Sequence, residues 1–172
     1  NINKLASEVR KLGGAVIWIT AVVKDGAGME NWGNYFNVIL GDPAKLDDFL
    51  GYIGGEGHGT QLWRELDIED ADVKITKSRY SALAPGTSDL LRALRTRRID
   101  NLLIAGTKTN VCCESTARDA HELEFNVAMV SDCLATLSDR EHVATLETFI
   151  QQFGDVVTSG EAITALNNHA NE

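Results

Sequence analysis

Long apolar segments are missing from this sequence. No hydrophobic run approaches the roughly 20 residues that a helix needs to span a bilayer, and no stretch at the N-terminus has the pattern of a signal peptide. We therefore expect no membrane contact and a cytoplasmic location.

Cysteine is also scarce. The chain has three, Cys112, Cys113 and Cys133, and an odd number that includes two neighbours suggests no disulfide framework. A lack of disulfides fits a reducing compartment. The adjacent pair does not have the Cys-x-x-Cys spacing of redox motifs, so thiol redox chemistry is the less favoured use of these residues.

Positive charge is in the minority. The chain has 16 Lys and Arg residues against 25 Asp and Glu residues, which gives a net charge of −9 at pH 7. An acidic surface repels nucleic acid and anionic membranes. We therefore expect a small-molecule substrate as the partner, and neither nucleic acid nor membrane.

Clusters of metal ligands are absent as well. The four histidines are spread along the chain at His58, His121, His142 and His169. A metal site needs several ligands that converge, so we expect no metal, and we expect no other cofactor. The glycine-rich run at 54–59 lacks the spacing of a phosphate-binding loop.

The residues that are present predict one α/β domain over 1–172. The length suits a single core, and a hydrophobic fraction of 44% is typical of globular proteins. Strands alternate with helices, which favours a doubly wound, Rossmann-like, mostly parallel sheet with helices on both faces. Strands are predicted at 15–23, 72–76, 102–105, 126–130 and 155–158, and helices at 2–12, 88–97, 111–122, 139–152 and 161–168.

A long irregular stretch at 24–56 follows the first predicted strand. Loops at the carboxyl ends of strands overhang the ligand crevice of doubly wound folds, so we interpret this stretch as a lid over the substrate. Trp32, Tyr35 and Phe36 are candidate wall residues. Alternatively, these aromatic residues only pack the loop onto the body of the protein or onto another subunit.

Cys112 lies where a predicted strand is followed by a helix. The apolar run at 102–105 ends at Gly106, and a helical pattern begins at Val111. A helix N-terminus favours the thiolate form of a cysteine, which is the nucleophilic form. The same free N–H groups can hold a developing oxyanion. The alternative is that Cys112 is a small buried apolar residue.

The segment GTKTNVCCESTARDA resembles the nucleophile segment of the isochorismatase-like cysteine hydrolases. The residues that match the family pattern are Gly106, Thr109, Cys112, Thr116, Ala117, Asp119 and Ala120. The resemblance implies a six-stranded parallel sheet and a cysteine nucleophile. Metal-dependent members of the family carry an Asp-x-His run, which this sequence does not have.

A second segment, KSRYSALAPGTSDL, resembles the lysine segment of the same family. The matching residues are Lys77, Arg79, Ser81, Ala82 and Thr87, while Leu83 stands where the family usually has Phe. The resemblance implies that Lys77 stabilises the thiolate of Cys112 and lies within a few ångströms of it. Leu83 is then a candidate for the substrate pocket, and Thr87 is a candidate cap for the helix at 88–97.

The family pattern also implies a reaction. Members of the amidohydrolase branch, which includes nicotinamidases, carbamoylsarcosine amidases and ureidoacrylate amidohydrolases, cleave amide, ureido or carbamoyl C–N bonds through an acyl-enzyme. The resemblance implies an oxyanion hole made by the N–H groups of Lys108 and Cys112, a cis peptide bond between Thr107 and Lys108, and a substrate contact at Thr107. It also implies a homo-oligomer, a dimer or a tetramer.

One expected part of the family pattern is not found. Family members begin with a central strand that ends in the general-base Asp, and no segment here matches it. We therefore expect a break in the sheet, and 20–40 further residues before Asn1 in the natural protein. A native chain that begins at Asn1, with the strand at 15–23 paired directly to the strand before Lys77, would contradict this.

Two other functions stay open at this point. A chain without the Asp could be a catalytically impaired binding or scaffold domain of the same fold. A further branch of the family hydrolyses the vinyl ether of isochorismate without a cysteine nucleophile, and the presence of Cys112 argues against that branch.

Overall fold

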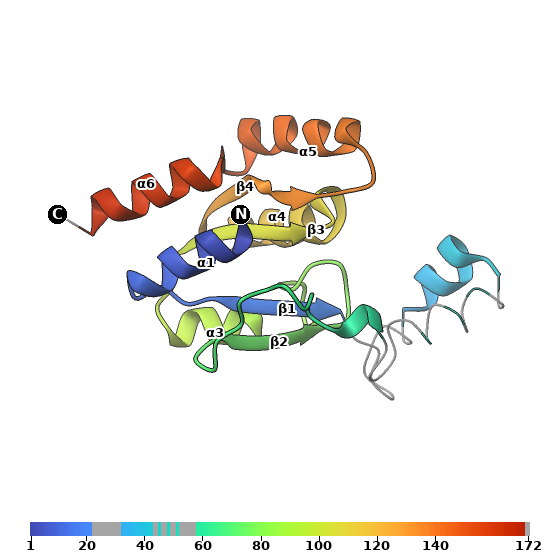
Figure 1. The fold of residues 1–172 in the computed structure, drawn as a ribbon. Helices are drawn as coiled ribbons and strands as arrows, with labels where there is room; N and C mark the ends of the chain where they lie inside the picture. Colours follow the sequence, from blue (N-terminus) through green and yellow to red (C-terminus); the bar gives the residue numbers. More distant parts are fainter. Residues whose placement is uncertain (22–31, 43–44, 46–47, 49–50, 52–57, 171–172) are drawn as a thin grey trace.

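A computed structural model describes residues 1–21, 32–42, 45, 48, 51 and 58–170 (Figure 1). The strands are β1 (Ile17–Ala21), β2 (Val73–Lys77), β3 (Asn101–Thr107), β4 (Asn126–Ala135) and β5 (Asp155–Val157). The helices are α1 (Ile2–Lys11), α3 (Leu90–Thr96), α4 (Glu114–Glu122), α5 (Asp139–Gln152) and α6 (Ser159–His169). Short helical turns lie at Tyr35–Leu40, His58–Thr60 and Thr109–Cys113.

The strands form parallel sheets, as the alternating pattern predicted. β1 pairs with β2, and β3, β4 and β5 pair in that order. Every pairing is parallel, with Ile19 opposite Ile75 in the first sheet and Leu103 opposite Ala128 in the second. The architecture is therefore α/β with parallel sheets.

The helices cover both faces of the sheets (Figure 1). On one face, α3, α4 and α5 bury their apolar sides in the larger core, which includes Leu94, Ala117 and Phe149. On the other face, α1 and α6 pack together over β4, around Leu5 and Ala162. Amphipathic helices on opposite faces of parallel strands are the arrangement of a doubly wound fold.

The expected break in the sheet is present among the described strands. β1 and β3 belong to different sheets and do not pair with each other. β1 pairs directly with β2, which is one of the two conditions named above that together would contradict a missing strand. The break lies between β1 and β3 (Figure 1), and the further residues before Asn1 stay a prediction. All five residues of β1 are only half-buried, whereas the sequence had predicted a strand covered on both faces.

Some predicted boundaries were wrong. The fourth strand was expected to end at Val130, before two polar residues, but β4 continues to Ala135. It continues because a register shift between Ile104 and Gly106 lets β3 pair with the later part of β4. Both polar residues are used within the strand: Ser131 donates to the carbonyl of Val157, and Asp132 accepts hydrogen bonds from the amide and hydroxyl of Ser159, at the start of α6.

The cap expected for the third helix was also wrong. Thr87 does not cap it, because α3 begins at Leu90 with Asp89 in the N-cap position. The hydroxyl of Thr87 instead accepts the amide N–H of Ser78, just after β2. Thr87 therefore closes the loop that follows Lys77.

Most of the predicted lid at 24–56 lies outside the described residues. Within the described ranges, no helix is both long and apolar enough to cross a bilayer.

Candidate active site

Lys77 ends β2 with its side chain buried. Only 7% of the residue is exposed. Its ammonium donates to the carbonyls of Arg79 and Tyr80, at 2.7 and 2.8 Å, and contacts Cys112 Sγ at 3.5 Å. A lysine ammonium has three donors, so these three contacts use its full capacity. The proximity of Lys77 and Cys112 that the resemblance implied is therefore observed.

Cys112 belongs to the π-helical turn Thr109–Cys113, which we call the Cys112 turn. This turn begins just after β3 and continues directly into α4. The carbonyl of Lys108 accepts the amide N–H groups of both Val111 and Cys113 at 3.2 Å. The peptide bond between Thr107 and Lys108 is cis, as the resemblance implied. The helical segment thus starts two residues earlier than the predicted Val111.

One side chain connects the lysine segment to the Cys112 turn. The Thr116 hydroxyl donates to the carbonyl of Cys112 at 2.8 Å and accepts the amide N–H of Ala82 at 3.0 Å. Both Thr116 and Ala82 are buried. Two segments that follow strands of different sheets are therefore held against each other.

An aromatic cluster includes Tyr80, whose carbonyl accepts a hydrogen bond from the Lys77 ammonium. Trp32 stacks on Tyr35 with 5.1 Å between ring centroids, and it meets Tyr80 edge-on at 4.7 Å. The Arg79 guanidinium lies over the Trp32 ring at 5.2 Å. Burial raises the pKa of Tyr80, and Tyr35 and Cys112 add to this effect. The candidate wall residues Trp32 and Tyr35 thus contact Tyr80, whose pKa is raised in part by Cys112.

Sequence reasoning missed Tyr80. It lies three residues after Lys77 in the segment that resembles the family's lysine segment, so a signal was available. Its ring packs edge-on against both Trp32 and Tyr35, and its carbonyl accepts a hydrogen bond from the Lys77 ammonium. Tyr80 therefore links the aromatic cluster to the lysine.

Comparison with known proteins agrees with this geometry. The isochorismatase domain family matches residues 1–161. The chain belongs to the isochorismatase family of hydrolases.

Relatives in this family have similar sequences and folds. The chain is 32% identical over 165 residues to the uncharacterized isochorismatase family protein YwoC of Bacillus subtilis, with 94% of this chain and 79% of the relative covered. It is 32% identical over 170 residues to the ureidoacrylate amidohydrolase RutB of Variovorax paradoxus, with 92% and 64% covered. A cysteine hydrolase structure from Pseudomonas syringae matches with a TM-score of 0.79 and 25% identity, with 97% and 78% covered.

The chain spans only part of the length of these relatives. Coverage is 79%, 64% and 55% for three curated relatives from Bacillus, Variovorax and Pseudomonas.

The remaining residues predicted from the isochorismatase family pattern differ in their placement. Thr107 and Lys108 are exposed at the end of β3. Leu83 is buried in the larger core, so its contact with substrate stays a prediction. The side chain of Phe36 lies outside the described residues.

The two other cysteines are buried and have no disulfide partner. Burial, which is the largest effect, raises the pKa of Cys113 to about 12. Burial also raises the pKa of Cys133. Both cysteines therefore pack inside the protein.

Carboxylates and metal ligands do not gather at the site in the described part of the chain. Among those residues, Lys77 forms no ion pair with a carboxylate, and no three His, Cys, Asp or Glu residues group as metal ligands. Asp25, which follows the first predicted strand, lies outside the described residues.

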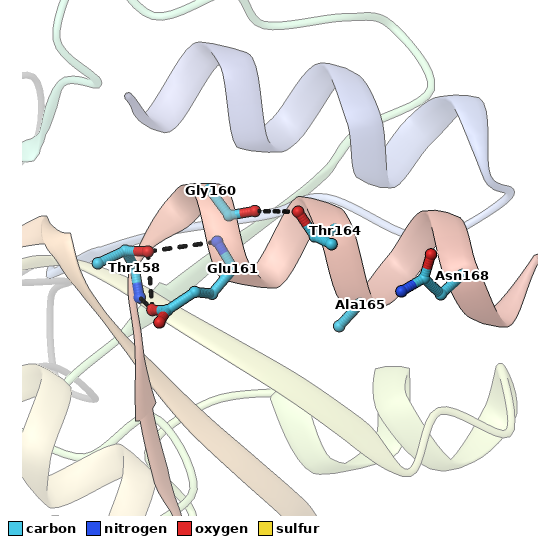
Figure 2. Close-up of a pocket in the computed structure, with 6 residues that line it drawn as sticks. All are labelled: Thr158, Gly160, Glu161, Thr164, Ala165 and Asn168. Carbon is cyan, nitrogen blue, oxygen red and sulfur yellow. Dashed lines mark hydrogen bonds between the residues drawn. The ribbon is translucent and has the colours of Figure 1, made fainter.

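A separate shallow pocket lies along α6 (Figure 2). Its lining residues are Thr158, Gly160, Glu161, Thr164, Ala165 and Asn168. The polar groups there serve the helix itself: Thr158 and Glu161 form a reciprocal cap, and Thr164 donates to the carbonyl of Gly160. None of the predicted site residues lines this pocket.

Proposed function

We propose that this chain is a cysteine-dependent hydrolase that cleaves the C–N bond of a small amide, ureido or carbamoyl compound through a covalent acyl-enzyme. The observation that carries the proposal is the 3.5 Å contact between the buried Lys77 ammonium and Cys112 Sγ. A lysine held against a cysteine in this way is an arrangement that promotes thiol nucleophilicity.

The position of the Lys77 ammonium supports Cys112 as the attacking group. Within the described residues, the partners of the Lys77 ammonium besides Cys112 are two neutral carbonyls. A buried cation without a counter-charge is costly. We therefore propose that the ammonium stabilises the negative charge on Cys112 Sγ as the sulfur attacks the substrate.

The proposed reaction has two halves. Cys112 Sγ attacks the carbonyl carbon, and the amide N–H groups of Lys108 and Cys112 hold the oxyanion. The tetrahedral intermediate collapses, the C–N bond breaks, and the nitrogen leaves as ammonia or an amine after it gains a proton. Water then adds to the thioester and releases the acid, which returns the thiol.

The aromatic cluster supports a small substrate with a flat group. Tyr80 lies near enough to Cys112 for the two to interact electrostatically, and Trp32 packs edge-on against Tyr80. Aromatic side chains bury much apolar area and can stack on planar groups such as ureido or amide units. We propose that these residues form one wall of the substrate site.

A second candidate function is a catalytically impaired binding domain. It is favoured by one observation: no carboxylate in the described part of the chain pairs with Lys77. The proposed reaction needs a group that takes the thiol proton and passes it to the leaving nitrogen, and this group has not been assigned.

The test is a panel of ureido acids, carbamoyl compounds and primary amides, assayed for ammonia release. Ureidoacrylate belongs in the panel because a relative is named for it. We expect release with at least one compound, a covalent acyl adduct on Cys112 in intact-mass spectra, and no release from Cys112→Ala. Ligand binding without release, or near-normal kcat in Cys112→Ala, would favour the binding domain or another mechanism.

A further inference from the structure

We infer that His142 is a positioning residue, which acts through Thr109 to hold the Cys112 turn in place. The inference rests on the proposed function, because it concerns the nucleophile of that reaction. His142 Nδ1 lies 3.0 Å from the hydroxyl oxygen of Thr109. Thr109 is the first residue of the Cys112 turn, and its exposed fraction is 0%.

Thr109 lies between the two proposed oxyanion donors. The amide of Lys108 immediately precedes it, and the amide of Cys112 is three residues further along. The Lys108 carbonyl is also the acceptor for the amides of Val111 and Cys113. A displacement of Thr109 would therefore move both donors and the sulfur together.

Two further contacts tie the turn to the same region of the protein. The Thr136 hydroxyl, just after β4, donates to Asn110 Oδ1 at 2.6 Å. The Thr145 hydroxyl, on α5, lies 3.4 Å from the carboxylate of Glu114 at the start of α4. The segment from Thr136 to Thr145 therefore contacts the Cys112 turn near both ends of the turn. His142 contacts Thr109, the most buried residue of the turn.

The sequence places His142 there through an ordinary helix start. Ser138 is the N-cap of α5, and its hydroxyl accepts the amide N–H of Glu141. This cap fixes the first turn of α5, so His142 faces the Cys112 turn. The bond to Thr109 can form with Nδ1 as acceptor or as donor, because a hydroxyl can take either part.

The role predicts a specific kinetic signature. Charge on the carbonyl oxygen develops only in the transition state, so misplaced oxyanion donors lower kcat and leave KM nearly unchanged. A displaced sulfur also moves away from the Lys77 ammonium, which slows alkylation of Cys112 by iodoacetamide. The second readout does not depend on any hydrolytic activity.

The experiment compares His142→Leu, His142→Asn, Thr109→Val and Thr109→Ser with the wild type. The amide of Asn reaches about as far from the backbone as Nδ1 does, and Val has the shape of Thr without its hydroxyl. We expect His142→Leu and Thr109→Val to lower kcat about tenfold, with KM within about twofold. Alkylation of Cys112 should slow about threefold in both variants. His142→Asn and Thr109→Ser should stay within about twofold of the wild type in both assays.

Two controls sharpen the result. His121→Leu removes another histidine, one that packs edge-on against Phe153, and should leave both readouts unchanged. The double variant Thr109→Val/His142→Leu should be no slower than the slower single variant, because both changes remove the same bond.

Three outcomes would overturn the inference: His142→Leu alkylating at the wild-type rate, His142→Asn as slow as His142→Leu, or effects that multiply in the double variant. Each is separate from failure of the proposed function. Failure of that function would appear as normal turnover in Cys112→Ala, or as no hydrolysis by the wild type. In either case the alkylation rates of the variants would still test the role of His142.

Discussion

Lys77 and Cys112 meet across a break between two sheets. Lys77 is the last residue of β2, in the first sheet, and Cys112 follows β3, in the second. Their side chains are 3.5 Å apart although 35 positions separate them in the sequence. The contact depends on how the loop after β2 packs against α4, which Thr116 fixes by its two hydrogen bonds.

Replacing Lys77 should slow the chemistry of Cys112. Lys77→Met removes the ammonium and keeps much of the side-chain volume, so we expect iodoacetamide to alkylate Cys112 at least about tenfold more slowly at pH 7.5. Lys74→Met is the matched control, because Lys74 lies on the same strand and is exposed. Equal rates for Lys77→Met and the wild type, in folded protein, would show that the ammonium does not promote the thiolate.

The three cysteines should differ sharply in reactivity. Burial raises the pKa of Cys113 to about 12 and also raises the pKa of Cys133, so neither forms much thiolate near neutral pH. We expect peptide mass spectrometry after brief iodoacetamide treatment of the folded protein to find label on Cys112 first. Cys113→Ala and Cys133→Ala should keep most of the turnover, whereas Cys112→Ala should abolish it. Faster labelling of Cys113 than of Cys112 would reverse the assignment of the nucleophile.

Asp72 should make stability depend on pH. The Arg10 guanidinium binds the Asp72 carboxylate through two hydrogen bonds, and the Trp18 indole and the Glu69 amide also donate to it. The Asp72 side chain is only 2% exposed. These partners, Arg10 first, hold its pKa far below the usual range. The unfolded chain therefore takes up the proton first as the pH falls.

This stabilisation is present above the ordinary carboxyl pKa of about 4 and is lost as the pH falls from there toward the lowered folded value. We expect Asp72→Asn to lower the free energy of unfolding by about 2 kcal/mol at pH 7, and by less at pH 3, in urea titrations. Asp100→Asn is the control, because the ion pair of Asp100 with Arg95 is largely exposed and should contribute under about 1 kcal/mol. An unchanged difference between wild type and Asp72→Asn across this pH range would contradict the expectation.

Gly154 should resist any side chain. A Cβ at this position, between α5 and β5, would lie 2.3 Å from the carbonyl oxygen of Val127 and 3.0 Å from the Phe149 ring. Because both neighbours belong to packed elements, we expect Gly154→Ala to lower the free energy of unfolding by about 1–3 kcal/mol.

Gly160 is the matched control for Gly154. In α6 the nearest atom to an added Cβ is 3.9 Å away, so Gly160→Ala should raise stability by about 0.5–1 kcal/mol, since Ala favours a helix over Gly. Thermal melts of both variants should shift in opposite directions. A shift of the same sign and size in both would mean that the close approach at Gly154 does not determine its identity.

Local patterns in the sequence predicted most elements. The apolar runs around Ile19 and Leu103 predicted strands that the structure contains, although both strands are less buried than expected. The helix at 139–152 was predicted at its observed bounds. Such elements depend on periodicity and capping, which are properties of short segments. The end of β4 was predicted wrongly, because it depends on a register shift in β3, a partner strand that no local pattern reveals.

The candidate site shows the same division. The resemblance of the segments around Cys112 and Lys77 to the isochorismatase family indicated a nucleophile and its cation. His142 could not be chosen in this way, because its contact with Thr109 joins residues 33 positions apart. Tyr80 lies inside the segment that resembles the family's lysine segment, but its contact with Trp32 is not visible in that segment.

By itself, the sequence determined the order of strands and helices and the chemistry available at Cys112, because backbone preferences and side-chain reactivity are local properties. Family resemblance implied that Lys77 lies near Cys112, and the tertiary structure fixed the 3.5 Å contact, the burial of Lys77 and the burial of the neighbouring Cys113. The tertiary structure also decided that Asp72 receives Arg10 from a helix 62 positions earlier. Distance and burial arise only when segments far apart in the chain pack together, so no pattern of neighbouring residues specifies them.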